Sequence, residues 1–109
     1  MINIVTLTGW LTADPISRTT PGGVQRLCFD LHTKDSTAHD VQVACFIESS
    51  ALIHKVEPLL IPGRGIVIQG EMTQREVTKD GRTKWIAREV RVLGCEIPNR
   101  QPQSAPAAT

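Results

Sequence analysis

An apolar strand pattern interrupted by one glycine opens the chain and limits what it can fold into. Val5, Leu7 and Leu11 fall on one face by the two-residue period of a strand, and Gly9 lies between the last two. A glycine there removes a side chain where a small barrel must bend sharply. The strand ends at Asp14-Pro15, because proline cannot donate to a ladder, and a Thr-Pro-Gly-Gly turn follows. These signals predict the first hairpin of a small, strongly curved β-barrel.

Alternating apolar residues predict four more strands and a single helix. The expected strands cover residues 3–11, 25–33, 41–48, 66–77 and 84–93. The side chains expected in the core are Leu27, Phe29, Leu31, Val41, Val43, Cys45 and Ile47. The helix begins at the capping residues Ser49 and Ser50, and its apolar positions are Leu52, Val56, Leu59 and Leu60. Pro58 limits it to about two turns.

Five strands with one short helix between the third and fourth form the layout of an OB-fold. We therefore expect an all-β domain, a five-stranded OB-fold Greek-key barrel, over residues 1–97 of the 109-residue chain. Residues 98–109 contain proline, alanine, glutamine and serine but little that can pack, so we expect a disordered tail.

The motif G-x-L-x-x-D-P at positions 9–15, followed by T-P-x-G at 20–23, resembles the N-terminus of bacterial single-stranded DNA-binding proteins. The similarity continues through Cys28–Thr33, through Gly63–Glu71 and into the turn Lys79-Asp80-Gly81, and it covers about residues 1–94. The primosomal replication protein N, a shorter relative with the same barrel, is nearly as similar.

The resemblance implies a protein that binds single-stranded DNA without sequence specificity and protects it during DNA replication, recombination or repair. It also implies a homo-oligomer, usually a tetramer of two dimers paired through their first strands. We expect no cofactor. We also expect a cytoplasmic location, because no apolar run of membrane-spanning length and no leader pattern is visible.

Positive charge gathers on the last hairpin, although the net charge of the chain is only +1. Residues 1–60 hold four basic and six acidic side chains. Residues 75–91 hold six basic side chains, Arg75, Lys79, Arg82, Lys84, Arg88 and Arg91, and three acidic ones, Glu76, Asp80 and Glu89. A basic β-ribbon of this kind could contact phosphates through Arg75, Lys79, Arg82, Lys84 and Arg88, or it could simply be a solvated hairpin. Arg18 and Lys34, in loops beside the second strand, are weaker phosphate-binding candidates.

Aromatic side chains outside the core are candidates for stacking on DNA bases. Phe46 alternates with Gln42 and Ala44, opposite the apolar face of its strand, and the resemblance aligns it with a stacking phenylalanine. Trp85 lies among basic residues, where stacking and packing against a neighbour are equally compatible with the sequence. For Trp10 a subunit contact or a barrel cap is favoured over stacking. Phe46 could also cover a barrel end or a subunit contact.

Departures from the family pattern favour an alternative function. Asp40 and Val77 stand where the family has stacking tryptophans, and the final residues show no acidic, phenylalanine-ended tip. The chain therefore resembles a divergent member. The alternative is a primosome-like adaptor dimer that acts mainly through replication or repair proteins and binds single-stranded DNA weakly.

Catalysis and metal binding find little support in the sequence. His32, His39 and His54 have no metal-ligand spacing, and no nucleophile motif such as G-x-S-x-G is present. Cys28, Cys45 and Cys95 lack C-x-x-C spacing and are expected to be reduced structural thiols. We therefore predict a protein that is not an enzyme.

Overall fold

The structure is a computed structural model that describes residues 1–79, 81 and 83–97, including the side chains of all of these except 79, 83 and 84. Arg82 and the predicted tail, residues 98–109, lie outside the described residues. The elements in chain order are β1 (Val5–Gly9), β2 (Ile16–Thr19), β3 (Gln25–Lys34), β4 (Asp40–Ile47), α1 (Ser50–Val56), the 3-10 turn η1 (Glu57–Leu59), β5 (Ile66–Lys79) and β6 (Thr83–Glu96). The expected all-β class is confirmed.

The expected count of five strands is wrong, because the described residues form six. The additional strand is β2, which begins directly after Pro15 and pairs antiparallel with β3 from Ile16↔Cys28 to Thr19↔Gln25. Proline removes only its own backbone donor, and the turn at 20–23 folds the chain back so that pairing resumes. The turn is closed by hydrogen bonds from Gly23 N to Thr20 O and from Thr20 N to Val24 O.

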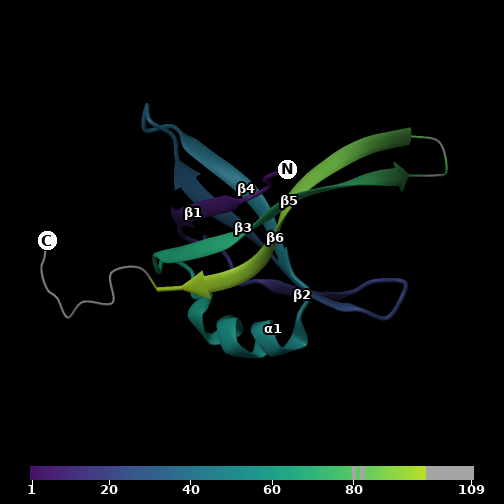
Figure 1. Cartoon of the computed structure of the whole chain (residues 1–109), viewed down its shortest axis with the longest axis horizontal. Helices are drawn as coiled ribbons and strands as arrows, with labels where there is room; N and C mark the ends of the chain where they lie inside the picture. The colour runs from purple at the N-terminus through teal and green to yellow at the C-terminus, as the bar shows by residue number, and fades with distance from the viewer. Residues whose placement is uncertain (80, 82, 98–109) are drawn as a thin grey trace, which may run out of the picture.

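The six strands form one sheet in the order β1-β5-β6-β4-β3-β2. All neighbours are antiparallel except β4 and β6, which meet in parallel at Cys45↔Val90 and Phe46↔Arg91. An isolated bridge, Trp10↔His32, connects the residue after β1 to β3. Strands β1, β5, β6, β4 and β3 therefore form a ring around the core (Figure 1).

Two glycines allow strands of this ring to approach closely. A Cβ atom on Gly9 would lie 2.0 Å from the backbone oxygen of His32, and one on Gly70 would lie 2.0 Å from that of Arg91. Gly9 therefore permits the close contact between β1 and β3. Gly70 stands at the register shift in the β5–β6 ladder, where a β-bulge increases the local bend.

The core lies inside the ring and follows the predicted alternation closely. Leu27, Phe29 and Leu31 of β3 are all buried, as are Cys45 and Ile47 of β4. The remaining buried members come from the helix, from β5 and β6, and from the segments that follow β1 and η1: Leu11, Ile53, Val56, Leu60, Ile66, Ile68, Val90, Val92 and Cys95. The expectation for Val41 is wrong, since its side chain is 37% exposed near the start of β4.

The predicted helix is present and closes one end of the ring. Ser49 caps it, since its hydroxyl oxygen accepts from the backbone N–H of Leu52. Ile53 and Val56 are its buried residues, so the apolar face is turned slightly from the one expected, and Leu52 is only partly buried. The helix lies beside the lower end of the sheet (Figure 1).

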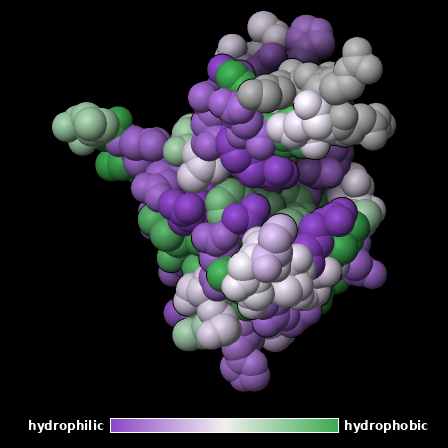
Figure 2. Space-filling view, turned by 90° about the vertical axis from the view of Figure 1, so that its right-hand side faces the viewer, coloured by the Kyte–Doolittle hydropathy of each residue, from purple (hydrophilic) through white to green (hydrophobic). Residues whose placement is uncertain are grey.

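Two hairpins extend beyond the ring on the same side of the molecule (Figure 1). The first joins β2 to β3, and the second, here named the arm, consists of residues 72–79 and 83–90 of β5 and β6. Figure 2 shows the side of the molecule from which these hairpins project, and the surface on this side is mostly hydrophilic. The predicted turn of the arm is supported by Gly81, whose φ of 66° suits glycine.

Candidate nucleic-acid interface

A groove runs across the outer face of β3 and β4, below the arm and beside β2. Its volume is about 520 Å³. The floor consists of outward-facing residues of the two central strands, Cys28, Asp30, Gln42 and Ala44, whose pairing places Asp30 opposite Ala44. Alternation along β3 explains this face, because Leu27, Phe29 and Leu31 point into the core and the residues between them point outward.

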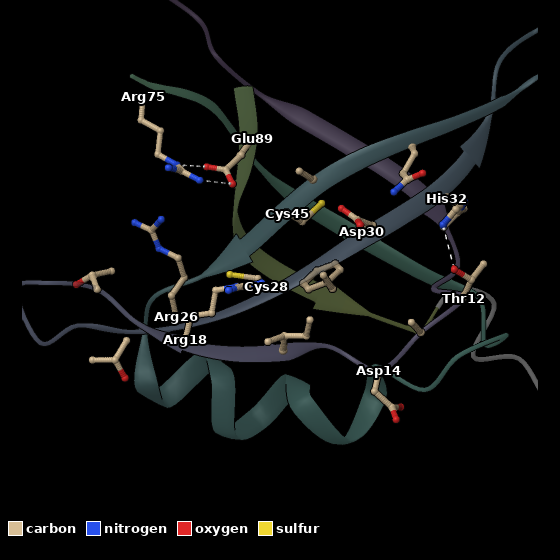
Figure 3. A pocket seen from close by; sticks show the side chains of 17 residues that line it. Thr12, Asp14, Arg18, Arg26, Cys28, Asp30, His32, Cys45, Arg75 and Glu89 are labelled. Atoms are coloured by element: carbon tan, nitrogen blue, oxygen red, sulfur yellow. Dashed lines mark hydrogen bonds and ion pairs between the residues drawn. The ribbon is translucent and has the colours of Figure 1, made fainter. Parts of the chain in front are cut away.

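Three arginine side chains converge at one end of this groove (Figure 3). Arg18 comes from β2, Arg26 from β3 and Arg75 from β5. The positive charges of all three lie close enough to Cys28 to favour its thiolate. Burial of the thiol has the larger effect, so the pKa of Cys28 is raised. The predicted candidates Arg18 and Arg75 are thus brought together, and Arg26 is a groove residue that sequence reasoning missed. Three acidic side chains also line the groove: Asp14 and Asp30 lie farther along it, and Glu89 lies at the arginine end beside Arg75 (Figure 3).

Arg75 does not present a free charge, because Glu89 on the neighbouring strand binds it. Its Nε donates to Glu89 Oε1 at 2.9 Å, and this hydrogen bond raises the pKa of Arg75. Arg75 nevertheless remains about half exposed while Glu89 is largely covered. The Nη2 of Arg75 donates to Glu89 Oε2 at 3.5 Å, so a phosphate at this end of the groove would meet the half-exposed remainder of the guanidinium group.

The Phe46 side chain lies on the outer face of β4, as its alternation predicted, but the expected exposure is wrong. Only 2% of Phe46 is accessible. The guanidinium carbon of Arg26 lies 4.3 Å from the ring centroid and that of Arg91 lies 5.6 Å from it. A base could therefore reach this ring only if the two arginine side chains moved.

Glutamates hold these arginines over the ring. Glu48 accepts from Nε of Arg26 at 3.1 Å and pairs with Nε of Arg91 at 3.6 Å. Glu71 accepts from Nη1 of Arg91 at 2.8 Å. Phe46 thus forms the apolar floor of a salt-bridged cover, with cation–π contacts from both arginines.

An aromatic pair lies near the opposite end of the groove. The bridge between Trp10 and His32 includes hydrogen bonds from Trp10 N to His32 O at 3.0 Å and from His32 N to Trp10 O at 2.8 Å. Residues paired in this way have side chains on the same sheet face, so Trp10 shares the outer face of β3 with His32. Their rings lie 6.2 Å apart with an interplanar angle of 26°. His32 Nε2 also lies 3.2 Å from Thr12 Oγ1 (Figure 3).

Lys34 extends this end of the outer face. Its Nζ lies 5.9 Å from the Trp10 ring centroid and 2.6 Å from Asp40 Oδ1. The hydrogen bond from Lys34 lowers the pKa of Asp40. Lys34 lies at the end of β3 rather than in the expected loop, two residues from His32 and on the same face.

Of the remaining predicted residues, Trp85 and Arg88 lie on the arm, and neither lines the groove. Trp85 is 48% exposed and pairs with Val77 across the two strands, on the same face as Ala87 and Glu89. Arg88 is exposed and opposite Gln74. Lys79 and Lys84 belong to β5 and β6, while their side chains lie outside the described part, as does all of Arg82.

All three cysteines are free thiols, as predicted. Burial raises the pKa of Cys45 to about 12 and that of Cys95 to about 11. Both therefore stay protonated at neutral pH and lack the thiolate that nucleophilic chemistry requires. Among the residues that the structure describes, no group of three histidine, cysteine or acidic side chains is arranged to hold a metal ion.

Comparison with known proteins does not supply a family. No protein-family model matches the chain, and no curated protein matches it. Within the described residues, none of the helical segments combines the length and the apolar character needed to cross a membrane.

Proposed function

We propose that this chain is a non-enzymatic OB-fold protein that binds single-stranded DNA without sequence specificity. The observation that carries the proposal is the convergence of Arg18, Arg26 and Arg75 from three strands on one end of the groove. Guanidinium groups from separate elements provide a positive end for a phosphate backbone, and the outer face of β3 and β4 provides a floor for unpaired bases. Protection of DNA during replication, recombination or repair would follow from such binding.

The arrangement of strands also supports an OB-fold. β1, β5, β6, β4 and β3 are linked in a ring, and α1 is inserted between β4 and β5, where an OB-fold has its helix. OB-folds bind oligonucleotides across the strand face that corresponds here to β3 and β4. The groove lies on that face.

A homo-oligomer, dimer or tetramer, belongs to the same proposal. In the described part of the chain, β1 pairs along its length with β5 on one side, and only its end reaches β3. An open strand edge of this kind is available for pairing with a second copy.

Charge removal at the arginine end tests the proposed function. We expect the variant Arg18→Gln/Arg75→Gln to lose affinity for every oligo-dT that is long enough to fill the groove. The magnitude of the slope of log affinity against log salt should fall by about 1.4, because each of two lost single-strand phosphate contacts contributes about 0.7. The variant Lys55→Gln/Arg64→Gln removes the same charge from α1 and from the loop before β5 and should leave the slope unchanged. If both variants show the same salt slope, the DNA does not contact the arginine end of the groove.

The alternative is an adaptor that acts mainly through proteins and binds single-stranded DNA weakly. Exposed apolar side chains on the arm favour it, namely Met72, Trp85 and Ile86. Binding of oligo-dT that is no tighter than micromolar at low salt, together with retention of a replication or repair protein, would support this function instead of the first.

A further inference from the structure

We infer that Trp10, His32 and Lys34 form a base-binding subsite that takes one unpaired nucleobase and its adjoining phosphate. This inference rests on the proposed function and assigns a position within that interface. It reverses the sequence-based preference for Trp10 as a subunit contact or a barrel cap. The three residues are named the Trp10 platform below.

The orientation of Trp10 follows from backbone pairing. A bridge with both hydrogen bonds exchanged holds Trp10 directly opposite His32, so neither side chain can turn into the core without breaking the pair. The preceding Gly9 permits this approach, because its absent Cβ would overlap the His32 carbonyl oxygen. The pairing of the strands therefore fixes the direction in which the indole points.

The geometry of the platform suits a planar ligand. The indole and imidazole rings are inclined by only 26°, with 6.2 Å between their centroids, and both side chains are half-buried. The two rings are stacked, so a base could extend the stack on the part of the indole surface that His32 leaves uncovered. Every nucleobase has a flat face that can stack on such a surface, so this contact would not depend on sequence.

A cation already lies over the indole ring. Lys34 Nζ lies within 6 Å of the indole centroid and shares a hydrogen bond with the exposed Asp40. An exposed ion pair of this kind is weak, so a phosphate attached to the stacked base could replace Asp40 as the partner of Lys34. The ligand class is therefore a nucleotide unit of a single strand.

The platform also extends the groove. His32 and Thr12 line it, and Arg18, Arg26 and Arg75 lie at its other end. One strand could thus stack a base on Trp10 and place a later phosphate among the arginines. Phe46, in contrast, is covered by Arg26 and Arg91.

The two tryptophans of the chain permit a direct test. In Trp85→Phe the emission comes from Trp10 alone, and in Trp10→Phe it comes from Trp85 alone. We expect oligo-dT to quench the emission of Trp85→Phe strongly. We expect Trp10→Ala to bind oligo-dT about ten- to hundredfold more weakly, and Trp10→Phe to lose less than about fivefold, because phenylalanine retains a stacking face.

The outcomes separate this inference from the function on which it rests. If the wild type binds oligo-dT but Trp85→Phe shows no quenching and Trp10→Ala binds normally, the platform is not a subsite while the function stands. If the wild type does not bind, the proposed function itself fails. Quenching in Trp85→Phe needs no truncation at Trp10, so the test holds even if Trp10→Ala fails to fold.

Discussion

Gly9→Ala is expected to lower the free energy of unfolding by about 3 kcal/mol, which is a large effect for the addition of one methyl group. The new Cβ would lie 2.0 Å from the backbone oxygen of His32 and 3.2 Å from Cγ of Leu31. A backbone oxygen in a paired strand cannot move aside as the end of a flexible side chain can. The Trp10–His32 bridge must therefore open, and β1 must separate from β3. Urea denaturation followed by circular dichroism measures the change.

Gly22→Ala is the matched control for this prediction. It adds the same methyl group, but its nearest neighbour is the Thr20 hydroxyl at 3.9 Å, an ordinary contact. Its free energy of unfolding should stay within about 0.5 kcal/mol of the wild type. A Gly9→Ala protein as stable as Gly22→Ala would contradict the close approach of β1 to β3.

Phe46→Ala is expected to cost about 3 kcal/mol of stability, because the substitution empties a site that is almost inaccessible to solvent. The cost lies at the lower end of the range for buried phenylalanines, since part of the cover consists of two arginine side chains that can collapse into the space. Thermal or urea denaturation checks the value.

Phe46→Leu is the matched control at this position. Leucine fills most of the volume but lacks the ring beneath Arg26 and Arg91, and we expect it to cost about 1 kcal/mol. The affinity of Phe46→Leu for oligo-dT should then equal that of the wild type, because the covered ring does not contact the strand. A stable Phe46→Leu protein with sharply reduced affinity would show instead that the arginine cover opens and that Phe46 stacks on a base.

Local patterns in the sequence were sufficient to predict most of the fold. Strand alternation identified β3 and its buried residues Leu27, Phe29 and Leu31, and the serine cap located the start of α1. The strand β2 was missed because its four residues are all exposed and show no alternation of burial. Its formation depends on the neighbouring β3 and on the turn between them.

The candidate site was less accessible to sequence reasoning, because side-chain exposure depends on contacts between distant residues. Phe46 was correctly placed on the outer face, but its cover comes from Arg26 and Arg91, which are distant in sequence. Alternation with the buried Leu11 indicated an outward Trp10, but its pairing with His32 depends on a bridge between residues distant in sequence. The glycine at position 9 was the available signal for that bridge.

Binding of single-stranded DNA is measured by titrating fluorescently labelled oligo-dT of about 35 nucleotides, a length that exceeds one OB-fold site. The titration is performed at two salt concentrations with unlabelled duplex DNA as competitor. We expect the single strand to bind less tightly as salt rises and not to be displaced by the duplex, because unpaired bases must reach the face of β3 and β4. Equal competition by the duplex, or no binding at low salt, would contradict this expectation.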